Sequence, residues 1–61
     1  MKFTIITQKS NIITDLVGIT EFVNMYRLGM ETLAQALMDG AEYFPLIKNH
    51  EIICVIRIVR M

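Results

Sequence analysis

Three glycines punctuate the middle of this chain at intervals of eleven residues, at Gly18, Gly29 and Gly40. Each follows a stretch whose apolar residues recur at the three- and four-residue spacing of a helix face. Glycine adopts positive φ at little steric cost, which makes it common just beyond a helix C-terminus. The pattern therefore predicts three short helices, over residues 12–17, 20–28 and 30–39, each ended by one glycine.

The segments that flank this helical region have the composition of strands. Residues 2–8 are rich in β-branched side chains and predict a first strand. Residues 41–48 and 51–60 predict a C-terminal β-hairpin, and the second arm has the strongest strand signal in the chain. We therefore expect a single α+β domain over residues 1–61, in the order β-α-α-α-β-β.

Two other arrangements fit the same residues. The spacing from Ile12 to Leu37 also suits one long helix or a coiled-coil seam, but two interior glycines would cost that helix about 1 kcal/mol each. Alternatively, residues 22–28 form a strand paired with the first, and a single helix begins at Met30. This version leaves the apolar residues 12–17 in a loop, so we rank the three-helix arrangement first.

Individual residues of the predicted hairpin indicate its turn, its place at a sheet edge and the two faces of its last strand. Asn49 and His50 suit its turn, and Pro45 cannot donate a ladder hydrogen bond, which assigns the first arm to a sheet edge. Alternate residues of the last strand point to opposite faces. One set is Ile52, Cys54, Ile56 and Ile58, which we expect to meet the helices, and the other is Ile53, Val55, Arg57 and Val59.

The chain carries more apolar surface than a domain of its size hides easily. It has 61 residues, 54% of them hydrophobic. A domain this small buries only about 60% of the surface that its unfolded chain exposes. We therefore expect the second set of last-strand residues to form the interface of a homodimer.

Catalytic and metal-binding residues are scarce. Ser10, His50 and Cys54 are each the single residue of their type, and an extended strand separates His50 from Cys54 by about 13 Å. We therefore expect no enzyme, no cofactor and no metal. The apolar run 52–56 is too short to cross a bilayer, and one cysteine permits no internal disulfide, so we expect no membrane contact and a cytoplasmic location.

Charge is unevenly distributed although the formal net charge is zero. The central region is acidic, with Arg27 as its single cation against Asp15, Glu21, Glu31, Asp39 and Glu42. An acidic surface suits a basic groove that normally holds nucleic acid. Our first hypothesis is a non-enzymatic regulator or inhibitor, in the size class of phage-encoded inhibitors of host enzymes, that binds a protein partner through Glu31, Gln35, Asp39, Glu42 and Tyr43.

Part of the chain resembles a family of transcriptional repressors. The element order, together with Leu33, Ala36, Leu37, Gly40, Tyr43 and Phe44, resembles the last helix and hairpin of the Cro repressors of lambdoid phages. The resemblance implies a dimeric operator-binding protein with a helix-turn-helix in the major groove. Met25 and Gln35 depart from the small and apolar residues of that pattern, and the last helix has no Lys or Arg. DNA binding is therefore the second hypothesis.

A third hypothesis is a structural assembly subunit. In this version the apolar last strand, residues 51–60, completes the sheet of a larger assembly. Exposed strand edges are the usual template for such association.

Overall fold

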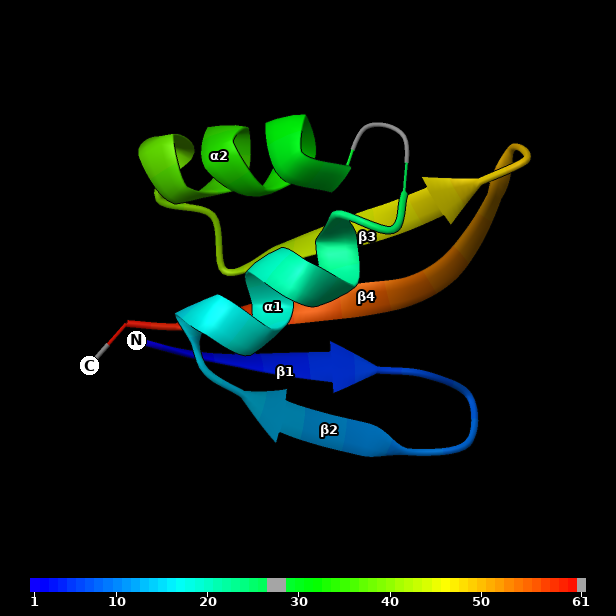
Figure 1. The fold of residues 1–61 in the computed structure, drawn as a ribbon, viewed down its shortest axis with the longest axis horizontal. Helices are drawn as coiled ribbons and strands as arrows, with labels where there is room; N and C mark the ends of the chain where they lie inside the picture. The colour runs from blue at the N-terminus through cyan, green and yellow to red at the C-terminus, as the bar shows by residue number, and fades with distance from the viewer. Residues whose placement is uncertain (27–28, 61) are drawn as a thin grey trace.

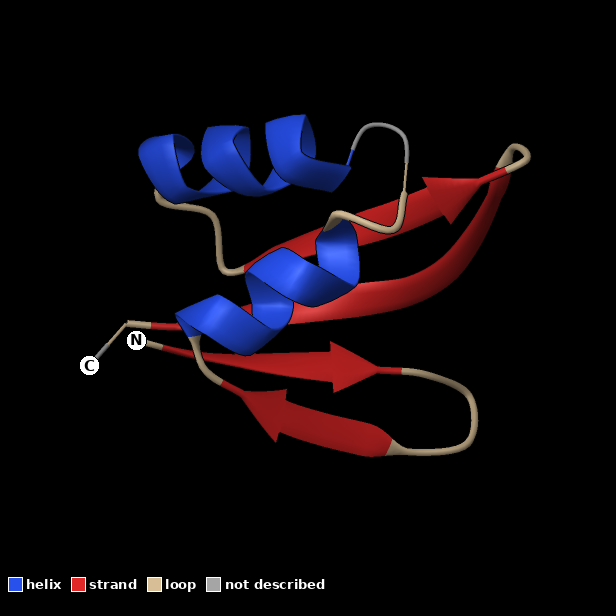
Figure 2. Cartoon of the chain, viewed as in Figure 1, coloured by secondary structure: helices blue, strands red, loops and turns tan. Residues whose placement is uncertain are grey.

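The computed structural model describes residues 1–26 and 29–60. Its elements are β1 (Lys2–Ile6), β2 (Asn11–Thr14), α1 (Leu16–Val23), α2 (Gly29–Asp39), β3 (Tyr43–Lys48) and β4 (Glu51–Val59). The strands form an antiparallel sheet in the order β2-β1-β4-β3 (Figure 1). Figure 2 shows α1 over the middle of the sheet and α2 alongside β3. The α+β class is confirmed, whereas the order β-α-α-α-β-β is wrong.

The helix predicted over residues 12–17 is not formed, because its first half is strand β2. The backbone N–H of Ser10 donates to Thr7 Oγ1 at 3.0 Å, and Thr7 N–H donates to the Ser10 carbonyl at 2.9 Å. These bonds close a tight turn that carries the chain back along β1. Ile12 then pairs with Ile5 and Ile13 with Thr4. The β-branched side chains that suggested a helix face fit this ladder equally well.

Helix α1 begins later than the sequence predicts. Asp15 is its N-cap, and Asp15 Oδ1 accepts a hydrogen bond from the Gly18 N–H at 2.9 Å. Gly18 therefore lies in the first turn rather than beyond a C-terminus. A Cβ at this position would stand 1.9 Å from Thr14 Oγ1, so glycine permits the close approach of α1 to the end of β2.

Helix α1 ends at Val23, which leaves part of the predicted helix 20–28 outside it. Residues 22 and 23 are helical, so the strand proposed for 22–28 does not form there either. The end of that segment, residues 27–28, lies outside the described residues. Since α1 and α2 are separate elements, the alternative of one long helix is also wrong.

Helix α2 confirms the third predicted helix, but Gly29 begins it instead of ending the one before. Gly29 is buried, and a Cβ there would stand 2.1 Å from the Val23 carbonyl oxygen. The glycine thus lets α2 start against the end of α1. Gly40, with φ of 72°, ends α2 as predicted, and the Ala41 N–H donates to the Ala36 carbonyl at 3.0 Å, as in a Schellman motif.

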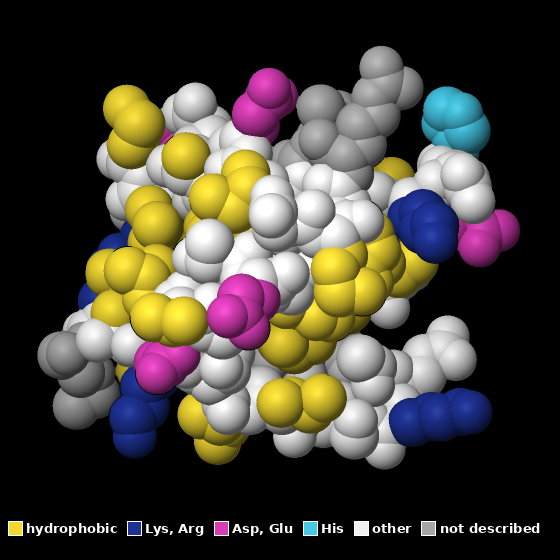
Figure 3. Space-filling view, in the orientation of Figure 1, with side chains coloured by type: hydrophobic (Ala, Val, Ile, Leu, Met, Phe, Trp, Pro, Cys, Tyr) yellow, Lys and Arg dark blue, Asp and Glu magenta, His cyan; other side chains and the backbone are white. Residues whose placement is uncertain are grey.

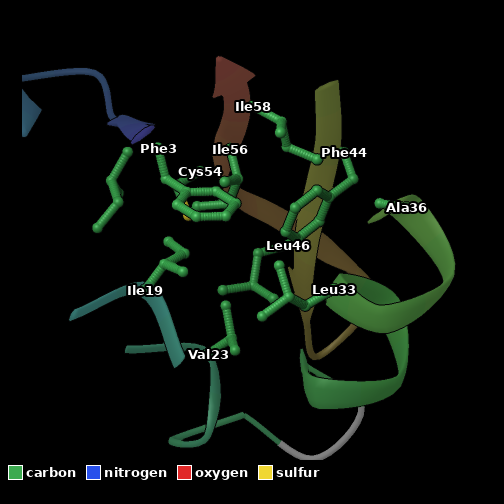
Figure 4. Close-up of a cluster of buried hydrophobic side chains, with 11 residues drawn as sticks. Phe3, Ile19, Val23, Leu33, Ala36, Phe44, Leu46, Cys54, Ile56 and Ile58 are labelled. Carbon is green, nitrogen blue, oxygen red and sulfur yellow. The ribbon is translucent and has the colours of Figure 1, made fainter. Parts of the chain in front are cut away.

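The core lies between the sheet and the two helices (Figure 4). Its buried side chains are Phe3, Ile5, Ile19, Val23, Leu33, Ala36, Phe44, Leu46, Cys54, Ile56 and Ile58. Cys54 is a free cysteine within this cluster, as predicted, and burial raises the pKa of its thiol. In the described part of the chain no helix has the length and hydropathy that a membrane crossing needs.

The C-terminal hairpin forms as predicted, and β3 with Pro45 is an edge strand. A β-bulge interrupts its ladder, because Leu46 pairs with Cys54 while Ile47 pairs with Ile52. Ile53 is the extra residue, so the strict alternation expected for β4 fails at this point. Ile52 consequently is 64% exposed instead of joining the core.

Replacing Gly29 tests the close approach of the two helices. We expect Gly29→Ala to lower the free energy of unfolding by about 1–3 kcal/mol, because its Cβ collides with backbone atoms of Val23. Urea unfolding at fixed protein concentration measures the change. Met38→Ala, on an exposed position of the same helix, is the control and should change stability by less than about 0.5 kcal/mol. A Gly29→Ala variant as stable as wild type would contradict the packing.

The turn of the hairpin offers a second test. Asn49 and His50 have φ of 53° and 66°, the values of a type I′ turn, in which Asn-Gly is the preferred pair. We expect His50→Gly to raise the free energy of unfolding by about 0.5–1 kcal/mol because it relieves the left-handed conformation. His50→Ala keeps that conformation and should bring no gain. Thermal unfolding compares the two variants, and equal stability would contradict this explanation.

Candidate functional site

Three polar side chains form a straight line on the exposed surface of α2. Glu31, Gln35 and Asp39 follow one another at four-residue spacing, which places them on one helix face. Gln35 Nε2 donates a hydrogen bond to Asp39 Oδ1 at 2.8 Å. This hydrogen bond fixes the position of the Gln35 side chain relative to that of Asp39. We call Glu31, Gln35 and Asp39 the α2 stripe.

The α2 stripe borders a shallow hollow between α2 and the start of β3. The hollow has a volume of about 520 Å³ and is lined by Glu31, Thr32, Gln35, Ala36, Asp39, Ala41 and Phe44. Its polar groups lie along the helix, while Ala36, Ala41 and Phe44 supply an apolar floor. A surface of this kind accepts a side chain that has an apolar stem and a charged end.

The stripe carries two carboxylates, of Glu31 and Asp39, and no cation of its own. Helix α2 contains no Lys or Arg, and no ion pair involves a carboxylate among residues 1–26 and 29–60. Glu31 lies in the first turn, where the helix dipole favours an anion, but Asp39 lies in the last turn, where it does not. Asp39 is therefore an electrostatic cost to α2, which its hydrogen bond with Gln35 offsets in part.

Arg60 supplies the positive charge that the C-terminus of α2 lacks. Its Nη1 donates to the Ala41 carbonyl at 2.5 Å, and its Nη2 donates to the carbonyls of Ala36 and Leu37 at 3.3 and 3.4 Å. The guanidinium thus ties the end of the chain to the last turn of the helix. No local sequence pattern indicates this role, because the carbonyl partners of Arg60 are 19 to 24 residues away along the chain.

The other predicted partner-binding residues do not join the α2 stripe. Glu42 lines a separate small hollow that also includes Arg57 and Arg60. Tyr43 alternates with buried Phe44 along β3, so it lies on the sheet face away from α2. There it pairs with Arg57, whose Cζ is 6.0 Å from the centroid of the Tyr43 ring. The structure therefore brings together Glu31, Gln35 and Asp39 but separates Tyr43 from them.

The remaining acidic residues are dispersed as well. Asp15 is occupied as the N-cap of α1, and Glu21 is exposed further along that helix. Figure 3, which views the helix side, shows the acidic side chains as separate groups among apolar and uncharged ones. Of the acidic surface expected from the sequence, the α2 stripe is the part whose residues lie together.

The predicted dimer residues lie on the sheet face that α1 and α2 leave uncovered. Val55, Arg57 and Val59 alternate with buried Cys54, Ile56 and Ile58 along β4. Register extends this face onto the other strands, because cross-strand partners share a face. We call it the open sheet face, and its apolar members are Ile6, Ile13, Tyr43, Pro45, Ile47, Ile52, Ile53, Val55 and Val59.

Strand β4 itself offers no free edge. It pairs with β1 on one side and with β3 on the other. The apolar last strand therefore cannot complete another sheet by edge pairing, as the assembly-subunit hypothesis requires, without losing one of these neighbours. The edges of the sheet are β2 and β3.

The structure does not assemble a catalytic or metal-binding group from His50 and Cys54. His50 is exposed in the hairpin turn, whereas Cys54 is buried in the core with a raised thiol pKa. The thiol is therefore protonated near neutral pH and a weak nucleophile. Among the residues that the structure describes, no three His, Cys, Asp or Glu side chains gather where they could hold a metal ion.

No protein-family model matches the chain, and no curated protein or solved structure matches it.

Arg60 provides a test of how α2 is held. We expect Arg60→Met to lower the free energy of unfolding by about 1 kcal/mol, because it removes hydrogen bonds and a favourable charge at the helix C-terminus. Lys9→Met, at an exposed position of the β1–β2 turn, is the charge-matched control and should have little effect. Urea unfolding measures both. Equal stability of the two variants would show that the Arg60 contacts contribute nothing.

Proposed function

We propose that this chain is a small non-enzymatic regulator or inhibitor that acts by binding a basic surface of another protein through α2. The observation that carries the proposal is the α2 stripe: carboxylates of Glu31 and Asp39, free of ion pairs among the described residues, beside a hollow with an apolar floor. Asp39 lies in the last turn of α2, where the helix dipole disfavours a carboxylate. A role in binding accounts for that cost.

The shape of the hollow indicates what such a partner presents. An Arg or Lys side chain laid across it would pack its aliphatic stem on Ala41 and Phe44. Its charged end would then reach the carboxylate of Glu31 or Asp39, which lie at the two ends of the stripe. Charge-assisted hydrogen bonds of this kind are stronger than neutral ones. A basic groove with several such side chains fits the stripe best.

A protein partner suits this surface better than duplex DNA. Helix α2 offers no cation to phosphate, and Glu31 and Asp39 would repel it. The same carboxylates attract a protein that normally binds phosphate, and complementary potential raises the rate of association. Occupying such a groove excludes nucleic acid from it. The chain would therefore regulate its partner by competing with nucleic acid for the same groove.

The test is capture of a partner from a nuclease-treated cell lysate. The double variant Glu31→Gln/Asp39→Asn removes both carboxylates of the stripe with little change of shape. We expect it to bind the captured protein roughly 5- to 30-fold more weakly, from about 0.5–1 kcal/mol per lost ion pair. Binding by the wild-type chain should weaken as salt is raised.

A matched double variant controls for net charge. Glu21→Gln/Glu51→Gln removes the same charge from α1 and β4, away from the stripe, and should bind as wild type does. Equal loss in both double variants would mean that net charge alone governs binding, against the proposal. Salt-dependent retention of a DNA duplex by the pure protein would favour the repressor hypothesis instead.

A further inference from the structure

We propose that a second copy of this chain covers the open sheet face, in a two-fold symmetric dimer whose sheets pack face to face. This inference is independent of the α2 stripe, which lies on the helix side of the sheet. The proposed interface includes Ile53, Val55, Arg57 and Val59, which the sequence suggested, and residues of the other three strands.

The open sheet face has an apolar centre. Val55 lies beside Pro45 on one side and Ile6 on the other. Toward the hairpin turn, Ile47 and Ile52 form the next pair and are 58% and 64% exposed. Ile13 on β2 is 70% exposed. Exposed isoleucines spread over one sheet face are unusual for a monomer and mark an interaction surface.

The size of this face matches what a stable dimer needs. The face extends over four strands, and five of its large side chains are 36–70% exposed: Ile13, Tyr43, Ile47, Ile52 and Ile53. Stable interfaces bury about 800 Å² per partner. The exposed surface of these side chains, with that of the less exposed ones between them, is on the order of that area. A chain with a small core also has the most to gain from a second copy, because the dimer merges two uncovered faces into one interior.

The charges on the face select one arrangement of the two copies. Arg57 and Lys2 lie toward one end, on the chain-terminal side of Val55, and the sheet register pairs neither of them with an acidic residue. A two-fold axis along β4 would set Arg57 of one copy against Arg57 of the other. A two-fold axis that runs perpendicular to the strands and passes near Val55 instead keeps the two Arg57 side chains apart. This axis places Arg57 of one copy opposite Ile53 on β4 of the other copy, toward the hairpin turn.

This arrangement gives both parts of the Arg57 side chain a favourable place. Its aliphatic stem packs on Ile53 of the second copy, while the charged end reaches the rim of the interface. Within its own chain the guanidinium stays near the Tyr43 ring, at 6.0 Å from the centroid, which offsets part of the cost of removing water from the cation.

Sedimentation of the pure protein tests the dimer. The wild-type chain of 7.0 kDa should sediment at twice that mass and dissociate only on strong dilution. Val55→Lys places a charge at the centre of the face and should raise the dimer dissociation constant by at least about 100-fold. Val17→Lys, at a position of α1 that is 66% exposed, is the matched control and should stay dimeric.

A milder variant distinguishes loss of the dimer from loss of the fold. Ile47→Thr keeps a β-branched side chain on the edge strand and should weaken the dimer about 10-fold while circular dichroism shows a folded chain. A wild-type monomer at every concentration would overturn the proposal and leave the face to another protein. A dimer that survives Val55→Lys, or one that Val17→Lys dissociates, would also overturn it.

Disulfide cross-linking tests the arrangement of the copies. Arg57→Cys and Ile53→Cys chains, mixed and treated with an added oxidant, should form a cross-linked pair that contains one chain of each kind. Positions 53 and 57 are about 13 Å apart along one strand, too far for a disulfide within a chain. Cross-linking of the Arg57→Cys chain with itself, and not with Ile53→Cys, would overturn the axis across the strands.

Discussion

The antiparallel pairing of β1 with β4 is the interaction on which the rest of this structure depends. It joins the two ends of the chain, with Phe3 opposite Ile58 and Ile5 opposite Ile56, and all four side chains are buried. Figure 1 shows the two strands side by side in the middle of the sheet. The neighbouring strands, β2 and β3, are held on their outer edges. Without this pair the helices would have no surface to cover.

Covering one side of that sheet gives the molecule two unlike surfaces. The helix side carries the α2 stripe, whose carboxylates suit a basic partner. The other side is the open sheet face, which is apolar at its centre and suits a second copy. Because the two surfaces lie on opposite sides of the sheet, occupation of one leaves the other accessible. The proposed dimer would display two α2 stripes outward.

The sequence located elements best where local signals agreed with long-range contacts. Helix α2 combines strong helix formers with Gly40 at its end, and the hairpin combines β-branched residues with a turn that tolerates positive φ. The helix prediction failed at residues 12–17 because isoleucines at adjacent positions fit a helix face and a strand equally well. Gly18 and Gly29 were misassigned because close approach to Thr14 and Val23, rather than helix termination, explains them.

The sequence by itself determined the α+β class, the first strand, α2, the hairpin with Pro45 at an edge, and a buried Cys54. These features follow from propensity, periodicity and proline chemistry, which act over a few neighbouring residues. Tertiary structure alone decided that residues 11–14 pair with β1, that Arg60 caps α2, and that Tyr43 lies apart from the α2 stripe. Each of these depends on contacts or register between separate segments, and no local pattern encodes which segments meet.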